Sequence, residues 1–432
     1  MPKVFFTSNA NFPSAFKQFL SEKRETSVEV DQTVRDIISQ VRSKGDRALL
    51  ELSLKFDTID LAQKGIVVEW SEIDHAIKLC PKDTLEALSF AANRIRSHHL
   101  KQLPSALNYT DDLGVKLGDR WTSVDSVGLY VPGGLASYPS SVLMNAIPAV
   151  VAGVPRIAMV VPAPKGEINP LVLAAAQMSG VNEIYRIGGA QAVAALAYGT
   201  ESIQPVVKIV GPGNAYVAAA KRQVFGTVGI DNIAGPSEVL IIADRHNNPD
   251  WIAADLLAQA EHDRAAQSIL MTDDREFAKL VDDAVSRQLA TLPRGNIAGE
   301  SWNIFGAIII MNSFDEAPAL ADSIAAEHLQ ISTADSEGLA QKIRNAGAIF
   351  IGKYTAEVIG DYVAGSNHVL PTARSARFSS GLGVLDFMKR TSFLRLDSAS
   401  LKEVAKPAML LAQAEGLEAH RRAIELRLEV KS

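Results

Sequence analysis

From residue 127 onward, short β-rich runs of this sequence alternate with helical segments. The runs lie at residues 127–131, 157–161, 184–187, 207–210, 239–242, 269–271, 307–311 and 348–351. Such alternation is typical of βαβ units, which build mostly parallel sheets covered by helices. The sequence therefore predicts an α/β fold.

The chain is too long for a single core. At 432 residues it exceeds the size at which one hydrophobic core stops growing. Residues 128–235 are rich in Gly and Pro at their turns, whereas residues 34–56 and 85–100 carry apolar residues at helical spacing, as does the region after Phe387. We interpret residues 128–235 as one α/β lobe inserted between the halves of another.

The composition of the chain argues against several classes of function. A net charge of −6 with no concentrated basic run argues against a nucleic-acid partner. The N-terminus lacks a signal-peptide pattern, and the most apolar stretch, 142–164, is broken by Pro and Arg, so we expect no membrane span and a cytoplasmic location. The single cysteine, Cys80, excludes a multi-Cys metal site.

One glycine turn leads into a predicted helix, as phosphate-binding loops do. Gly211, Gly213 and Asn214 follow a strand-like run and open a helix, whose first N–H groups can hold a phosphate. The third glycine of the dinucleotide fingerprint is absent. A simple tight turn explains the same residues equally well.

Several of the eight histidines stand beside carboxylates or amides at suggestive spacings. These groupings are Gln259 with His262, Asp361 with His368, and Glu415 with His420. For any one histidine, an ordinary structural role is the better interpretation. Several such groupings together favour an N/O metal site, although spacing alone does not select its members.

Glu327 and His328 place a carboxylate and an imidazole side by side, which are two groups suited to proton transfer. The alternative interpretation of this pair is a solvated helix end.

Eight ordered blocks give the chain a family resemblance. They are GLYVPGG (128–134), YPSSVLMNA (138–146), GPGNAYV (211–217), AGPSEVL (234–240), DLLAQAEHD (255–263), EHL (327–329), GDYVAGSNHVLPT (360–372) and FSSGLGV (378–384). In this order and number they resemble the histidinol dehydrogenase family. Two departures from its pattern are Asn232, where Met is expected, and residues 373–375, Ala-Arg-Ser, in place of a glycine-rich stretch.

The resemblance implies two incomplete Rossmann-like lobes with mostly parallel sheets. It divides the chain into a first lobe of residues 24–129 and 236–381, an inserted second lobe of residues 130–235, and terminal segments 1–23 and 382–432 that intertwine in a homodimer. The terminal segments are expected to be helical and to serve dimerisation.

The resemblance also implies the cofactors and the site. One zinc ion per subunit is expected on Gln259, His262 and Asp361, with His420 of the partner subunit as the fourth ligand. NAD contacts are expected from Tyr130, Gln191 and Asn214. Contacts to L-histidinol are expected from Ser237, Gln259, His262, His328, Asp361, His368, Glu415 and His420.

The implied reaction is the oxidation of L-histidinol through L-histidinal to L-histidine, which takes two hydride transfers to NAD. We hypothesise that His328 removes the hydroxyl proton and that Glu327 activates the water that hydrates the aldehyde. Cys80 lies outside every block, which disfavours a cysteine nucleophile. The alternatives are a dehydrogenase of the same scaffold for another small alcohol, a zinc hydrolase, and a binding protein without catalysis.

Overall fold

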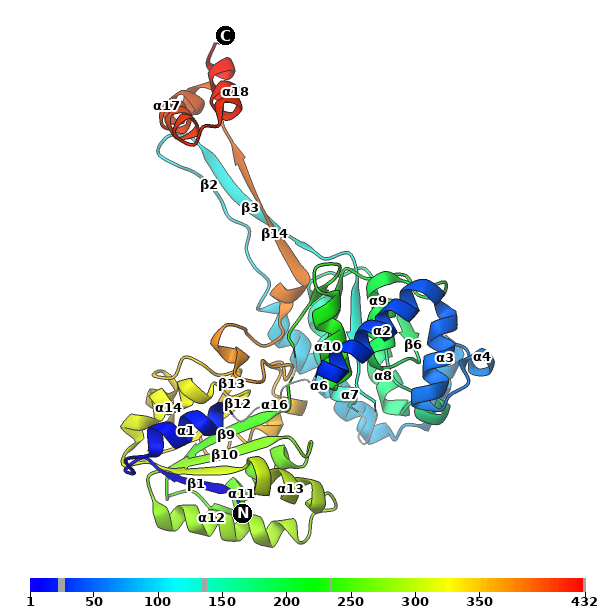
Figure 1. Ribbon diagram of the computed structural model, residues 1–432, viewed down its shortest axis with the longest axis vertical. Helices are drawn as coiled ribbons and strands as arrows, with labels where there is room; N and C mark the ends of the chain where they lie inside the picture. Colours follow the sequence, from blue (N-terminus) through cyan, green and yellow to red (C-terminus); the bar gives the residue numbers. More distant parts are fainter. Residues whose placement is uncertain (22–27, 134–137, 234, 430–432) are drawn as a thin grey trace.

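The structure is a computed structural model that describes residues 1–21, 28–133, 138–233 and 235–429. Two parallel sheets form the centres of two α/β lobes, and a third, antiparallel sheet forms an arm that projects from them (Figure 1). The predicted α/β fold with mostly parallel sheets is confirmed, and each of the predicted β-rich runs coincides with a strand. The predicted boundary at residue 24 and the block residues Gly134 and Ala234 lie outside the described residues.

The larger sheet has six strands, all paired in parallel. In spatial order they are β1 (Lys3–Phe6), β11 (Ala307–Ile310), β10 (Gln267–Thr272), β9 (Glu238–Ala243), β12 (His328–Ser332) and β13 (Ala348–Ile351). Successive residues of β9 alternate between two cores, because side chains alternate across a strand: Leu240 and Ile242 enter one core, Val239 and Ile241 the other. The sheet is therefore buried on both faces, and its strands read as continuous apolar runs.

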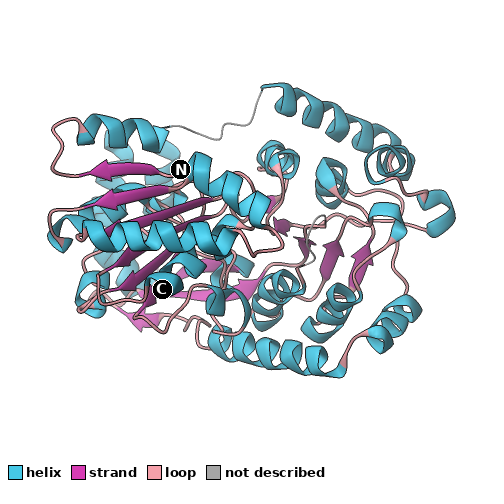
Figure 2. Ribbon diagram, turned by 90° about the horizontal axis from the view of Figure 1, so that it is seen from below, coloured by secondary structure: helices cyan, strands magenta, loops and turns pink. Residues whose placement is uncertain are grey.

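Helices cover both faces of this sheet, as Figure 2 shows. One core includes α1 (Phe12–Ser21), α14 (Ala317–Ile324) and α15 (Ser336–Ala340). The other includes α11 (Pro249–Ala260), α12 (Arg275–Leu289) and α13 (Gly295–Phe305). The short helix α16 (Val358–Tyr362) follows β13.

The smaller sheet has five parallel strands. They are β6 (Glu183–Tyr185), β5 (Ile157–Val160), β4 (Val127–Tyr130), β7 (Lys208–Val210) and β8 (Gly229–Ile230). One core contains α5 (Trp70–Leu79), α6 (Lys82–Leu100), α7 (Pro139–Val151) and α8 (Pro170–Ser179). The other contains α2 (Val28–Lys44), α3 (Asp46–Asp57), α4 (Leu61–Lys64), α9 (Gly189–Tyr198) and α10 (Ala215–Val224).

This packing corrects part of the predicted lobe division. The helices of residues 28–100 lie on the five-stranded sheet, not with residues 236–381, and residues 1–21 supply β1 and α1 to the six-stranded sheet. The physical reason is that an amphipathic helix reveals which of its faces is buried but not which sheet will bury it. The N-terminal segment is accordingly a structural part of the larger lobe.

The arm is a separate antiparallel sheet. Its strands are β14 (Met388–Arg395), β3 (Lys116–Ser123) and β2 (Asn108–Thr110), and it carries the helices α17 (Ser398–Ala414) and α18 (Glu418–Leu428) at its far end (Figure 1). Phe393 and Leu394 of β14 and Leu410 and Leu411 of α17 are exposed. Short 3-10 turns at Ser375–Arg377 and Val384–Phe387 precede β14, and two others lie at Pro164–Gly166 and Phe314–Glu316.

Across the described ranges, the structure contains no helix both long and apolar enough to cross a membrane.

Candidate active site

A buried polar cluster lies at the end of the six-stranded sheet where β12 begins. We define it as Glu327, His328, Glu357, Asp361 and His368. Glu327 directly precedes β12, and His328, its first residue, pairs with Val239, the second residue of β9, and with Ala348, the first residue of β13. The cluster therefore occupies the amino edge of this sheet, opposite the edge at which parallel α/β sheets usually bind ligands.

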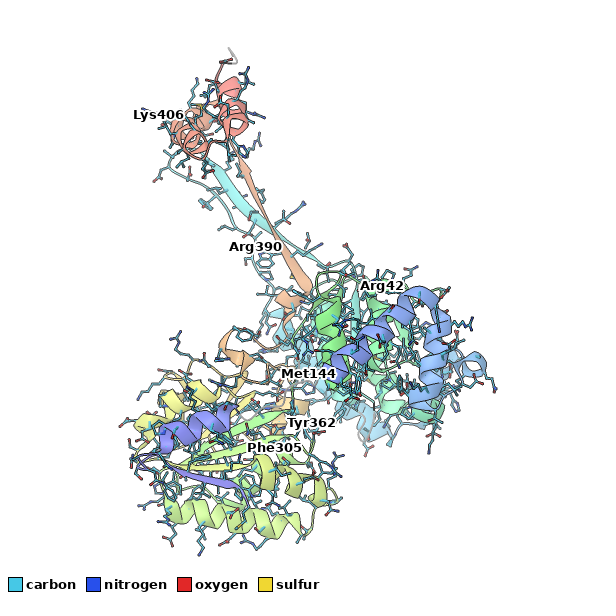
Figure 3. All side chains as sticks on the ribbon, viewed as in Figure 1. Arg42, Met144, Phe305, Tyr362, Arg390 and Lys406 are labelled. Atoms are coloured by element: carbon cyan, nitrogen blue, oxygen red, sulfur yellow. The ribbon has the colours of Figure 1, made fainter. Side chains whose placement is uncertain are left out.

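The cluster also touches the other lobe. Ser141 of α7 lies with its Oγ 3.3 Å from His368 Nε2, and Asn367 Nδ2 donates to the carbonyl of Met144, also on α7, at 2.7 Å. Figure 3 labels Met144 and Tyr362 of α16 at the junction of the two lobes. Both lobes thus contribute to one site.

The backbone of Glu238 holds Glu327 and His328 in place. Its N–H donates to Glu327 Oε2 at 3.0 Å, and its carbonyl oxygen lies 3.2 Å from His328 Nδ1. A carbonyl can only accept, so this contact assigns the proton to Nδ1 and leaves a lone pair on Nε2. His328 Nε2 is buried and has no hydrogen-bond partner among the described residues. It is positioned to act as a base.

Burial controls the protonation of these groups. Desolvation raises the pKa of Glu327 well above the ordinary value of a carboxyl. Desolvation lowers the pKa of His328 to about 3 and that of His368 to about 4. In this buried environment, desolvation favours the neutral form of each group.

Two further carboxyls face His328. Its Nε2 lies 3.9 Å from Glu357 Oε1 and 4.0 Å from Asp361 Oδ1. His368 Nδ1 donates to the Asp361 carbonyl at 3.0 Å and lies 3.6 Å from its Oδ1. Burial raises the pKa of Glu357 to about 8 and that of Asp361 to about 7, and the negative charge of Asp361 adds to the shift at Glu357. His328, Glu357 and Asp361 offer ligand atoms within 4.8 Å of one another.

Gln259 and His262 come from the end of α11. The helix begins at an Asn248 cap and Pro249, and its last turn carries Gln259, whose carbonyl accepts the His262 N–H at 3.2 Å. Gln259 is fully buried, yet neither its amide oxygen nor its amide nitrogen has a hydrogen-bond partner among the described residues. A buried amide without partners costs on the order of 1–3 kcal/mol, a cost that a bound group offering such partners would relieve.

His262 belongs to the same neighbourhood as the cluster. Burial lowers the pKa of His262, the Glu261 charge opposes this shift, and the Arg294 charge adds to it. A charge on His262 would in turn lower the pKa of both His328 and His368. Gln259, His262 and Asp361 are therefore brought to one region.

The residues expected to contact NAD lie at the carboxyl edge of the five-stranded sheet. Tyr130 ends β4, Gln191 lies in the first turn of α9 after β6, and Asn214 caps α10 after β7. The Tyr130 hydroxyl accepts the Gly189 N–H at 3.0 Å. Asn214 Oδ1 accepts the N–H groups of residues 216 and 217, so its side chain already has a capping role. Gly211 takes a φ of 112°, which is why a glycine stands there.

The remaining predicted contacts divide into two groups. Ser237 directly precedes β9 at the edge that carries the cluster, and its carbonyl accepts the N–H of Gln267 at 3.0 Å. Glu415 and His420 are exposed and lie on the arm helices, away from both lobes (Figure 1). Within one chain the structure does not bring these two residues to the cluster.

Sequence reasoning missed Glu357. It lies one turn before Asp361, and residues four apart share a helix face, so the spacing of the two carboxylates was an available signal. Glu357 precedes the block that begins at Gly360, so the family resemblance does not mark this position.

The fold and this cluster define the class of the protein: an α/β enzyme with an acid–base site at the junction of two lobes. The chain belongs to the histidinol dehydrogenase family, whose model matches residues 20–428. The enzyme is therefore an oxidoreductase, and the predicted family and enzyme class are confirmed.

Individual relatives are similar to this chain over nearly its whole length. Histidinol dehydrogenase from Brucella abortus (strain 2308) is 64% identical over 423 residues, covering 98% of each chain. Its namesake from Rhizobium meliloti (strain 1021) is 64% identical over 422 residues, covering 98% of this chain and 97% of the relative. The crystal structure of histidinol dehydrogenase from Elizabethkingia anophelis matches with a TM-score of 0.95 at 34% identity, covering 99% of this chain and 98% of that one.

Proposed function

We propose that this chain oxidises L-histidinol through L-histidinal to L-histidine, with NAD as the oxidant and zinc as a required metal. The observation that carries the proposal is His328, a buried neutral imidazole with an unpartnered Nε2, fixed beside the carboxyl of Glu327. The names of the relatives supply the substrate, since they are histidinol dehydrogenases.

Gln259, His262 and Asp361 fit a zinc ion. Imidazole nitrogen and carboxylate oxygen are ordinary zinc ligands, and an amide oxygen completes an N/O set. The unpartnered amide of Gln259 and the raised pKa of Asp361 are both costs that a bound cation relieves. When bound, zinc supplies a positive charge and coordination positions that orient the imidazole and amine of histidinol.

A second copy of the chain supplies the missing ligands in this proposal. His420 and Glu415 are exposed on an arm that projects from its own lobes, and neither reaches the cluster of its own chain (Figure 1). We therefore assign the fourth zinc position to His420 of the partner subunit and a substrate contact to Glu415 of the partner subunit. The active unit is then a homodimer with intertwined arms.

The carboxyl edge of the five-stranded sheet fits NAD. Two glycine turns, at Gly188–Gly189 and Gly211–Gly213, lead into α9 and α10. The N–H groups at helix N-termini bind phosphates, and this is the edge where dinucleotides bind parallel sheets. We assign contacts to Tyr130, Gln191 and Asn214. NAD, when bound, accepts the hydride in each oxidation.

The residues of the chain carry the proton chemistry. In the first oxidation His328 Nε2 takes the hydroxyl proton as the C–H hydride leaves. In the second, the Glu327 carboxylate takes a proton from the water as its oxygen bonds to the aldehyde carbon, and the resulting hydrate anion then loses its hydride to give the carboxylic acid. Glu327 works in its ionised form, so its raised pKa makes this step faster as the pH rises. Ser237 and His368 line the substrate position in this assignment.

Cysteine chemistry has no place in this scheme. Cys80 caps the end of α5, its Sγ faces the carbonyl of Ala76 at 3.4 Å, and burial raises the pKa of the thiol. A protonated thiol outside the cluster is not a nucleophile for the aldehyde.

The test is NADH formation from limiting L-histidinol, before and after chelation and after zinc restoration. Two NADH per histidinol, lost on chelation and restored by zinc, supports the proposal. No NADH from the zinc-loaded protein with histidinol overturns it. NADH formed only from another small alcohol identifies a different substrate on the same scaffold, and zinc-dependent turnover without NAD identifies a hydrolase.

A further inference from the structure

The side chain of Arg294 contacts the turn that carries His262 from the neighbouring loop. Arg294 Nε donates to the carbonyl of Glu261 at 2.9 Å, and its Nη2 donates to the carbonyl of His262 at 3.3 Å. One guanidinium thus bridges two successive carbonyls just beyond the C-terminus of α11.

The chemistry of this contact restrains the backbone. The last carbonyls of a helix have no partner inside the helix, and a positive charge near them is favourable. A guanidinium presents its N–H groups in a fixed planar fork, so binding two carbonyls at once fixes their relative orientation. Because the ring of His262 is attached to this backbone, its direction is restrained together with that of Gln259 in the preceding turn.

Arg294 itself stands on a tightly closed loop between α12 and α13. The carbonyl of Leu292 accepts the Gly295 N–H at 2.9 Å, and the carbonyl of Arg294 accepts the Ile297 N–H at 2.9 Å. A Cβ at Gly295 would overlap the carbonyl oxygen of Leu289, so the loop has no room to shift toward α12. The backbone that carries the Arg294 side chain is therefore fixed in position.

A second contact links the same turn to α13 but lies in solvent. Arg264 Nη1 is 3.0 Å from Glu300 Oε2, with side chains 68% and 42% exposed. Exposed ion pairs contribute little, because water screens the charges and the side chains lose freedom. This pair offers a matched control for the loss of an arginine at this turn.

We propose that Arg294 is a positioning residue for the metal ligands Gln259 and His262, and this role rests on the zinc centre proposed above. The guanidinium contacts neither ligand side chain; it fixes the backbone from which both project. Without the two hydrogen bonds of Arg294, the side chains of Gln259 and His262 are still present but are no longer held in the geometry that the metal requires. Metal affinity therefore falls more than the stability of the fold.

The experiment measures zinc affinity of the full-length protein by competition with a chromogenic chelator, for the wild type and for Arg294→Gln, Arg294→Lys and Arg264→Gln. Removing a group that orients metal ligands typically weakens affinity about 10- to 100-fold, which we expect for Arg294→Gln. Lys has a single ammonium that cannot fork to two carbonyls, so Arg294→Lys should lose affinity to an intermediate extent. Arg264→Gln should remain within about twofold of the wild type.

The outcomes distinguish the positioning role of Arg294 from the zinc centre itself. If Arg294→Gln binds zinc as tightly as the wild type, the role of Arg294 is overturned and the zinc centre is not. If the wild type does not bind zinc, both the zinc centre and the role of Arg294 are overturned. If Arg294→Gln does not fold, Arg294→Lys decides: unchanged affinity overturns the proposal, and weakened affinity with an unchanged melting temperature supports it. Equal losses in Arg294→Gln and Arg264→Gln also overturn it, because they would reflect a general loosening of the turn.

Discussion

Replacing Glu327 with Gln should separate the two oxidations. Gln has the shape of Glu, and its Oε1 can accept the Glu238 N–H that now reaches Glu327 Oε2 at 3.0 Å, so the buried position keeps its partner. The variant should therefore fold normally. What it loses is the base that activates water, a contribution of about 10²- to 10⁴-fold, or about 3–5 kcal/mol in the barrier of the second oxidation.

The assay follows NADH in a rapid-mixing experiment with limiting histidinol, and separately with added histidinal. Glu327→Gln should release its first NADH within about tenfold of the wild-type rate and its second far more slowly. With histidinol as the substrate, His328→Asn should slow the release of both NADH molecules, because Nε2 of His328 is the base of the first step, which supplies the aldehyde for the second. Equal losses in both oxidations of Glu327→Gln would refute the division of roles between the two residues.

Three further predictions concern stability and reactivity. Ala373→Gly should raise the free energy of unfolding by about 0.5–1 kcal/mol in a denaturant titration, because Ala373 has a φ of 54°, whereas Ala376→Gly, at a neighbouring site without positive φ, should lower it. The opposite order of the two variants would contradict this reasoning. The metal-free protein should lose stability as the pH rises from about 6.5 to about 8, because the raised pKa values of Glu357 and Asp361 make the folded state hold protons that the unfolded state has released, and above about pH 6.5 the lowered pKa values of His328 and His368 no longer oppose this loss. Zinc should flatten this dependence in urea titrations, and a metal-free stability that rises over the same range would be inconsistent with buried carboxyls. Cys80→Ser should keep both NADH yields within about twofold, since its thiol lies outside the cluster; loss of only the second NADH would point to a thiol intermediate.

The sequence located eight of the strands, because buried parallel strands leave continuous apolar runs, as in β9 and β11. Among the strands that it missed is β12, whose residues His328, Gln330 and Ser332 are polar although the whole strand is buried. Burial of those side chains depends on partners distant in sequence: Gln330 donates to Asp255 at 2.7 Å, and the hydroxyl of Ser332 is hydrogen-bonded to Asn247. A local pattern carries no information about such partners.

The candidate site, too, could be predicted from local sequence patterns only in part. Adjacent residues such as Glu327 and His328 are visible as a pair in the sequence, but their burial, which controls their protonation, comes from the sheet around them. The interpretation of this pair as a solvated helix end is wrong for that reason. The proximity of Asp361 and His328 depends on α16 and β12 meeting in space, which family resemblance could imply but periodicity could not.

The long-range strand pairings constrain the order in which the chain can fold as it is synthesised. Lys3 of β1 pairs with Ala307 of β11, and Ser123 of β3 pairs with Met388 of β14. During synthesis, β1 and β3 therefore cannot pair until most of the chain has left the ribosome, because their partner strands lie far along the sequence. Such non-local pairing is also slow to form. The arm, which needs residues 388–395, is completed after both lobes have all their strands. Any assembly through the arm is consequently a late event, available only to chains whose lobes have already been synthesised in full.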